Sequence, residues 1–289
     1  STDTKRRVGI VGYGKIGQYL VDAILNDKEV SALFQLAFVW NRSPEKVTES
    51  GSVPPELHCT DLADFAKFGA DLIVEVAHPD ITREFGERFV AAADYMVGSP
   101  TIFADAAVEA AMRKAAASKD GHGVYIPAGA FWGATDIEKM DERGSLAELS
   151  VTMKKHPSSL KVLGELQTKI QHMLDTKPEG DVVIYDGPVR GLCPLAPNNV
   201  NTMAAAALAA PTLGFDKVRA RLVANLSLMA HVIEIEALGP EREDGDRFRV
   251  STVRHNPAAV GAVTGKATFG SFVSSMLRAG GAGDGLHMC

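Results

Sequence analysis

The sequence predicts an α/β protein with a parallel, helix-covered sheet in its first half and an α+β unit with a mixed or antiparallel sheet in its second. Three observations support this fold class. A short apolar run over residues 8–11 breaks into a Gly-x-Gly-x-x-Gly motif, and a helical pattern follows. Apolar strand-like segments then alternate with helical segments up to about residue 127, which indicates βαβ units. Beyond about residue 131, strand-like segments follow one another across short turns, which is typical of antiparallel pairing.

The glycine motif is the strongest local signal in the chain. Gly12 permits a tight turn, Gly14 lets the backbone approach a pyrophosphate, and Gly17 lets the next helix pack closely on the strand. The start of that helix offers free N–H groups and a positive dipole to phosphates. The alternative is a Gly-rich turn with a structural role only. The motif predicts a Rossmann dinucleotide-binding domain in which the cofactor contacts Gly12, Gly14, Lys15, Ile16 and Gly17.

The end of the second predicted strand, residues 34–40, indicates which cofactor is preferred. An Asp or Glu there, roughly 20 residues past the glycines, would bind the ribose 2′-hydroxyl of NAD and repel a 2′-phosphate. This chain has Asn41, Arg42 and Ser43 instead. A neutral amide beside a cation favours NADP over NAD, with Arg42 and Ser43 binding the extra phosphate. The alternative is a polar turn that contacts no cofactor.

Other residues of the first half follow predicted strands at their carboxyl ends. Ligands of parallel sheets bind beyond these ends, so side chains there are expected near the cofactor. For His78 the alternative is a place beside the N-cap of the next helix. The residues predicted to lie near the cofactor on this ground are Ala77, His78, Gly98, Ser99 and Ala130.

Two domains are expected. The dinucleotide-binding domain spans residues 1–130, and an α+β domain that binds substrate and carries out catalysis spans residues 131–254. The C-terminal segment, residues 255–289, is apolar and helical enough to pack back on the first domain.

His231 is the candidate catalytic residue of the second half. Strand alternation puts it on the face of Ile233 and Ile235, opposite Glu234. A histidine on an apolar face is often purely structural, so the pattern alone leaves both roles open. The other histidines show no spacing that would suit a metal ion, so we expect no metal.

Polar residues elsewhere in the second half suit anionic and amide ligands. Lys154, Lys155 and Arg190 are candidates for binding an anionic substrate, although basic residues near strand ends are often simply solvated. Asn199 and Asn201 precede a helix, where an asparagine commonly serves as the N-cap. Their functional reading is hydrogen bonding to the nicotinamide carboxamide or ribose.

Composition excludes several classes of protein. The 289 residues are 46% hydrophobic and 23% charged, as in an ordinary globular protein, and the net charge of -6 argues against a nucleic-acid partner. No apolar run reaches the roughly 18 residues that a membrane span needs, and the N-terminus lacks an apolar signal core. Three scattered cysteines indicate neither a disulfide framework nor a metal cluster. We expect a cytoplasmic protein with a small-molecule substrate.

Six segments together resemble the L-aspartate dehydrogenase family, and more closely its mammalian aspartate dehydrogenase domain-containing group. Their order along nearly the whole chain is more specific than any one of them. They are residues 9–17, 74–77, 127–130, 197–201 and 230–236, and the pair Asn256-Pro257.

The resemblance implies an NAD(P)-dependent oxidation of L-aspartate to iminosuccinate, which becomes oxaloacetate and ammonia or feeds NAD biosynthesis. The family's catalytic histidine falls on His231, and its cofactor contacts fall on the glycine-rich loop, on Ala130 and on an asparagine of the Asn199/Asn201 pair. It also suggests a homodimer. A histidine that titrates near neutrality would serve as acid and base, while Lys154, Lys155 or Arg190 would bind the two substrate carboxylates.

Two alternatives remain open at this point. One is a related NADP-dependent reductase that acts on another small acid or aldehyde. The other is a non-catalytic NADP(H)-binding or redox-sensing protein.

Overall fold

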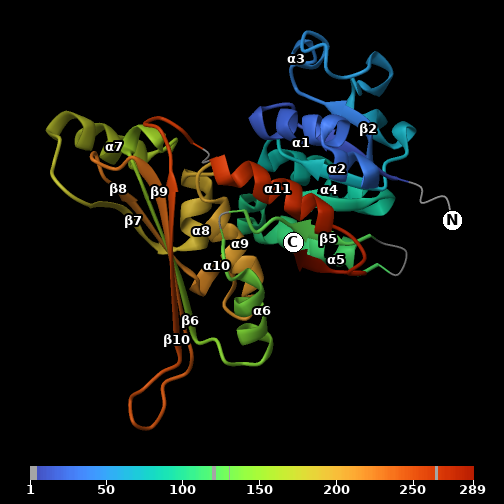
Figure 1. Ribbon diagram of the computed structural model, residues 1–289. Helices are drawn as coiled ribbons and strands as arrows, with labels where there is room; N and C mark the ends of the chain where they lie inside the picture. The colour runs from blue at the N-terminus through green and yellow to red at the C-terminus, as the bar shows by residue number, and fades with distance from the viewer. Residues whose placement is uncertain (1–4, 119–121, 130, 264–265) are drawn as a thin grey trace.

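A computed structural model describes residues 5–118, 122–129, 131–263 and 266–289 of the chain (Figure 1). The first sheet is six-stranded, with the order β11-β5-β4-β3-β1-β2, and its paired strands all run parallel. This arrangement confirms the predicted α/β class. Its strands are β1 Arg6–Val11, β2 Phe34–Trp40, β3 Leu72–Glu75, β4 Asp94–Val97, β5 Val124–Ile126 and β11 Leu286–Met288.

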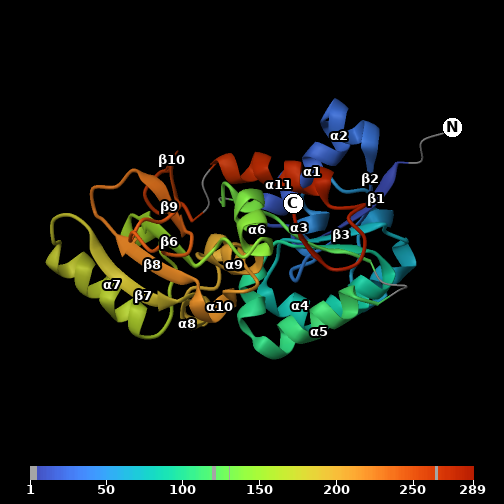
Figure 2. The ribbon, with the colours of Figure 1, turned by 90° about the horizontal axis from the view of Figure 1, so that it is seen from below.

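Helices cover both faces of this sheet (Figure 2), as the continuous apolar strands require. The helices α1 (Lys15–Asn26) and α11 (Lys266–Arg278) lie on one face, and α4 (Pro79–Ala92) and α5 (Ala106–Ala116) lie on the other. Helix α1 buries Leu20, Val21 and Ile24 along one stripe, as its helical period demands. The shorter helices of this half are α2 Lys28–Leu33, α3 Glu45–Thr48, η1 Pro55–Leu57, η2 Leu62–Phe68 and η3 Pro100–Ala104.

The second sheet has five strands in the order β10-β9-β6-β8-β7 and is mixed. Strands β6 and β8 are parallel, and the other neighbours are antiparallel. The sequence pattern missed strand β8, whose first three residues alternate between exposed arginines and a buried alanine. The bounds are β6 Glu148–Lys155, β7 Val182–Pro188, β8 Arg219–Ala224, β9 Ala230–Leu238 and β10 Arg249–Pro257.

Helix α9 (Asn201–Ala209) joins the two halves of the molecule. All of its residues after Asn201 are buried, because it packs between β6 of the second sheet and η3 of the first half. Its run of alanines lets the backbones approach closely on every side. The remaining helices are α6 Ala134–Glu142, η4 Pro157–Ser159, α7 Glu165–Thr176, α8 Val189–Leu192, η5 Cys193–Leu195 and α10 Gly214–Lys217.

The C-terminal segment returns to the first sheet after β10 ends at Pro257. Helix α11 lies against α1, where the rings of Phe269 and Tyr19 are 5.4 Å apart. Strand β11 then pairs in parallel with β5. Strand β11 has only three residues and follows a glycine-rich stretch, so its sequence is too short to show a strand pattern. Its pairing with β5 alone defines it as a strand. No helix in the described ranges is both long and apolar enough to cross a membrane.

Candidate active site

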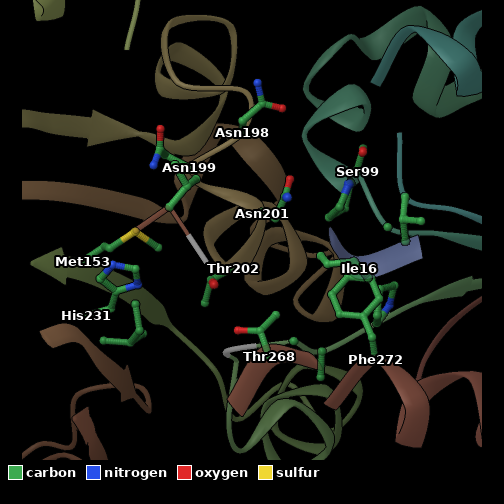
Figure 3. Close-up of a pocket in the computed structure, with 18 of the residues that line it drawn as sticks. Ile16, Ser99, Met153, Asn198, Asn199, Asn201, Thr202, His231, Thr268 and Phe272 are labelled. Atoms are coloured by element: carbon green, nitrogen blue, oxygen red, sulfur yellow. The ribbon is translucent and has the colours of Figure 1, made fainter. Parts of the chain in front are cut away.

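A cavity of about 250 Å³ lies between the carboxyl edge of the first sheet and one face of the second. Figure 3 shows His231 and Met153 on one side, and Ile16, Ser99 and Phe272 on the other. The N-terminal end of α9 lies between these two walls. The two halves of the chain therefore supply opposite walls of one site.

The glycine-rich loop is held by close backbone packing. Gly12 has φ of +111°, and a Cβ there would lie 2.8 Å from the Cα of Ala77. A Cβ on Gly17 would lie 1.9 Å from the carbonyl oxygen of Gly12. Gly14 differs, since no heavy atom of the described residues would lie within 4 Å of its Cβ. The loop thus leaves open space at Gly14, beside the uncapped start of α1, where a dinucleotide phosphate fits.

Lys15 and Ile16 follow this loop at the start of α1. Lys15 is exposed, and Ile16 lines the cavity. The glycine-rich loop therefore continues directly into the cavity wall.

Asn41 ties the end of β2 to the glycine-rich loop. Its Oδ1 accepts from the N–H of Tyr13 at 3.0 Å, and its Nδ2 donates to the carbonyl of Ser43 at 2.9 Å. Arg42 is exposed and makes no hydrogen bond or ion pair with the described part of the chain. Asn41 therefore shapes the loop, while the guanidinium of Arg42 is left to bind a ligand.

A buried carboxylate organises the loops after β3 and β4. Glu75 is fully buried and accepts from the N–H groups of Ala77 at 2.6 Å, His78 at 2.9 Å and Ser99 at 3.0 Å. Burial raises the pKa of Glu75 to about 7, and these hydrogen bonds oppose that rise. Because Ala77 also packs against Gly12, this one side chain positions three loops around the cofactor region.

The side chain of His78 does not line the cavity. Its Nδ1 accepts from the N–H of Asp80 at 3.3 Å and so caps α4. The ring instead borders a separate surface hollow that also includes Arg190. The structure thus shows the helix-capping alternative for His78, while Ala77 does reach the cavity.

Two rows of side chains cross the second sheet and face the cavity. Asn256 pairs with His231 across β10 and β9, and extending the β6–β9 register by one residue puts Lys155 on the other side of His231. The neighbouring row consists of Met153, Ile233 and Arg254. All six residues line the cavity.

His231 is 6% exposed, and its Nε2 lies 2.9 Å from the carbonyl oxygen of Ala262. A carbonyl only accepts, so Nε2 carries the proton and Nδ1 keeps its lone pair. Burial and then the charge of Lys155 lower the pKa of His231 to about 4, although the bond to Ala262 opposes this. The sequence predicts a histidine that titrates near neutrality, and this does not hold for His231 in the cavity without a bound anion. There the imidazole is neutral at physiological pH.

Lys155 is 4% exposed, and its Nζ donates to the carbonyl of Val263 at 3.2 Å. Burial lowers its pKa to about 8, and none of the described carboxylates forms an ion pair with it. A bound anion would stabilise such a buried ammonium, which lacks a counter-ion.

The other two predicted anion-binding residues lie away from the cavity. Lys154 points to the opposite face of β6 and pairs with Glu234 at 2.8 Å and Asp181 at 3.2 Å. Arg190 forms a bidentate pair with Asp216, at 2.6 and 2.8 Å. Both cations are therefore neutralised by the protein's own carboxylates, which sequence alone did not reveal.

The two predicted asparagines have different surroundings. The Oδ1 of Asn199 accepts from the N–H of Lys161 at 2.8 Å, and its Nδ2 donates to the carbonyl of Ser159 at 3.1 Å. Both asparagines line the cavity, and the Oδ1 of Asn201 is buried with no partner among the described residues. Neither side chain caps α9. Asn199 therefore anchors a loop, and Asn201 is the better placed of the two to bind a ligand.

Ala130 lies outside the described residues, although its neighbours Ala128 and Gly129 line the cavity. Sequence reasoning missed Thr202, Arg254, Thr268 and Phe272 as lining residues. For Arg254 the signal exists in the alternation of β10, but it becomes visible only once the register with His231 is known. Within the described ranges, no cluster of three His, Cys, Asp or Glu side chains could hold a metal ion.

Replacing Lys155 with methionine should raise the stability of the protein at neutral pH. Its folded pKa of about 8 lies below the unfolded value of 10.5, so between them the unfolded state binds more protons and wild-type stability rises with pH. The gain from removing the charge, on the order of 3 kcal/mol near neutrality, should vanish by pH 10.5. Melting temperatures across this range measure it.

Lys154→Met is the matched control, because Glu234 raises the pKa of Lys154 and its charge has carboxylate partners. That variant should be no more stable than wild type at any pH. A Lys155→Met protein that is less stable across the whole range would contradict the picture of an unpaired buried charge.

Comparison with known proteins shows dehydrogenase relatives for both halves of the chain. Residues 12–127 match the family model "Homoserine dehydrogenase, NAD binding domain", and residues 136–275 match "Aspartate dehydrogenase, C-terminal". An aspartate dehydrogenase domain-containing protein of Xenopus tropicalis is 52% identical over the full length of both chains. An L-aspartate dehydrogenase of Methanococcoides burtonii is 27% identical, covering 81% of this chain and 83% of its own.

Among solved structures, the aspartate dehydrogenase of Thermotoga maritima superposes with a TM-score of 0.66 at 19% identity, covering 95% of each chain. At that identity the likeness establishes a shared fold. The two-sheet architecture of the chain is thus shared with that protein.

Proposed function

Because this chain belongs to the family of aspartate dehydrogenase domain-containing proteins, we propose that it is an NAD(P)-dependent L-aspartate dehydrogenase. The observation that carries the proposal is the position of His231. A neutral imidazole with a free Nδ1 and the unpaired cation of Lys155 share one cavity wall, and the end of the glycine-rich loop forms the wall opposite. An acid–base group thus faces the place where a nicotinamide would lie.

The chain's own residues suit each part of such a cofactor. The backbone at Gly14 and the start of α1 would bind the phosphates, and the Oδ1 of Asn201 would accept from the carboxamide or a ribose hydroxyl. When bound, the nicotinamide ring supplies the hydride acceptor for the hydrogen on the substrate Cα. Every other step falls to the protein.

His231 would move the protons. Its Nδ1 would accept a proton from the substrate ammonium, so that the Cα of the neutral amine can lose hydride. After that proton has passed to solvent, Nδ1 would accept another from the water that attacks the imine. The low pKa of His231 applies to the cavity without a bound anion, in which the charge of Lys155 adds to the effect of burial. A substrate carboxylate on Lys155 would neutralise that charge and raise the pKa of His231 toward its usual range. Substrate binding would thus make His231 a stronger base.

The direct test is to follow NAD(P)H with the purified protein in both directions. We expect reduction of NAD(P) with L-aspartate, and oxidation of NAD(P)H with oxaloacetate only when ammonia is also present. Oxidation without ammonia would indicate a reductase acting on the keto acid itself. Tight cofactor binding without turnover on any amino or keto acid would instead favour the non-catalytic, NADP(H)-binding alternative.

Replacing Arg42 with alanine should weaken NADPH binding about tenfold or more and leave NADH binding unchanged. The exposed guanidinium has no partner in the described chain, and a 2′-phosphate would supply one. Fluorescence titration with both cofactors measures the two dissociation constants. Lys46→Ala, an exposed cation in α3, is the control. An Arg42→Ala protein that keeps its NADPH affinity would rule out this role and the preference for NADP that rests on it.

Several expectations from the sequence are not tested by the fold or the site. The homodimer, the cytoplasmic location, the absence of nucleic-acid and membrane partners, and the domain boundaries at residues 130 and 254 stay predictions.

A further inference from the structure

Arg254 occupies a position on the cavity wall that the proposed chemistry has not used. Strand β10 pairs Arg254 with Ile233 and Asn256 with His231, so the guanidinium projects from the same sheet face as the imidazole, one row away. It lines the cavity together with Lys155 and His231. These three are the ionisable side chains among the described residues that form the cavity, and no acidic residue is among them.

The contacts of Arg254 leave its charge uncompensated. One guanidinium nitrogen, Nη1, donates to the carbonyl of Gly129 at 3.4 Å, and the group lies 5.3 Å from the ring centroid of Trp132. The other, Nη2, is buried and has no partner in the described part of the chain. Burial lowers the pKa of Arg254, with no carboxylate to oppose it.

Two other arginines of the second half have the carboxylate partner that Arg254 lacks. Arg190 pairs with Asp216, and Arg249, on the same strand as Arg254, pairs with Glu236. Burying a guanidinium without a carboxylate costs free energy, which an anionic ligand would recover. Carboxylates match the planar fork of a guanidinium, and the aromatic face of Trp132 holds that fork in place.

We propose that Arg254 is the specificity-determining residue of the cavity and binds the second carboxylate of a dicarboxylic substrate. The inference rests on the proposed function for the reaction that is catalysed, whereas the binding of a carboxylate by Arg254 does not depend on it. Strand β9, which carries His231, lies between β6 with Lys155 and β10 with Arg254. A small dianion therefore satisfies both cations while its amine-bearing carbon faces the imidazole. A monocarboxylic amino acid leaves one of the two cations without a counter-ion.

The test compares L-aspartate with L-asparagine, which has nearly the same shape and lacks the second charge. In Arg254→Met the value of kcat/KM for aspartate should fall about 100-fold, mostly through KM, while that for asparagine changes only a few-fold. Arg254→Lys should recover part of the loss, because it restores charge without the fork. Arg249→Met, the same change on the exposed face of β10, should leave both substrates unaffected.

A second readout does not depend on turnover. Succinate, a dicarboxylate without an amine, should raise the melting temperature of the wild type and of Arg249→Met but not that of Arg254→Met. Without ligand, Arg254→Met should melt at or above the wild-type temperature, because methionine keeps the contact with Trp132 and removes an unpaired charge. A structural arginine would behave in the opposite way.

The outcomes separate the two proposals. If the wild type oxidises aspartate and Arg254→Met keeps the same preference over asparagine, the role of Arg254 is overturned while the proposed function stands. If the wild type does not oxidise aspartate but succinate stabilises it through Arg254, the proposed function fails and the dicarboxylate site stands. Equal stabilisation of wild type and Arg254→Met by succinate, or none of either, would overturn the inference.

Discussion

Replacing His231 with alanine should lower kcat about 10³-fold while the dissociation constant of the cofactor stays within a few-fold of wild type. The imidazole is the cavity's neutral acid–base group, with Nε2 bound to the carbonyl of Ala262 and Nδ1 left to take a proton. It faces the cavity from the second sheet, whereas the residues expected to bind the cofactor phosphates belong to the first half. Single-turnover kinetics together with cofactor titration measure the two effects separately.

His255→Ala is the matched control for that variant. His255 is exposed on the adjacent strand β10 and points to the opposite face of the sheet, so its loss should change neither quantity. If His231→Ala retained wild-type turnover, His231 would be a buried structural histidine, which is the alternative that the strand pattern left open. If it lost cofactor binding as well, its role would be to shape the site rather than to transfer protons.

Two substitutions in the glycine-rich loop should separate the stability of the fold from the binding of the cofactor. Gly17→Ala should destabilise the fold by about 3 kcal/mol, because the new Cβ would lie 1.9 Å from the Gly12 carbonyl oxygen and backbone cannot rotate aside. Gly14→Ala should leave stability within about 0.5 kcal/mol, since its φ of −80° suits alanine and the space beyond it is open. That methyl group would instead occupy the phosphate position and weaken cofactor binding at least tenfold.

Urea denaturation gives the change in the free energy of unfolding, and titration with NADH and NADPH gives the affinity. The pair of variants controls itself, because both add the same single carbon to the same loop. A Gly14→Ala protein with full affinity for both cofactors would show that no phosphate approaches the backbone there. A Gly17→Ala protein of wild-type stability would show that the helix can shift without cost.

The charge distribution of the cavity connects these expectations. Lys155 is a buried cation and Arg254 a partly buried one, and neither has a carboxylate partner in the described ranges. His231 is neutral because burial, and then the charge of Lys155, lower its pKa. Both cations cost stability in the absence of a ligand and favour an anion when one binds. This is the exchange of stability for function that binding sites commonly show.

Local patterns in the sequence were sufficient to predict the nucleotide-binding half. Strands and helices show apolar residues with periods of 2 and 3.6, and Gly12, Gly14 and Gly17 interrupt this pattern after the first strand. Both signals depend on residues that are close together in the chain, so they can be interpreted without the fold. His231 could be placed on the inner face of its strand for the same reason. Strands β8 and β11 escaped detection, and each is defined in the structure by pairing with a partner that is distant in the chain.

Which charged groups belong to the site was decided only by the tertiary structure. Lys154 and Lys155 are adjacent and chemically identical, yet the strand pleat sends Lys154 to Glu234 and Lys155 into the cavity. Arg190 carries the same charge as Arg254, but Asp216 lies within reach of Arg190, and no described carboxylate lies within reach of Arg254. Short-range periodicity and the glycine motif predicted the cofactor domain and the strand face of His231, and the family resemblance made that histidine the catalytic candidate. Ligand contacts depend on register and on partners far along the chain, and these exist only in the folded molecule.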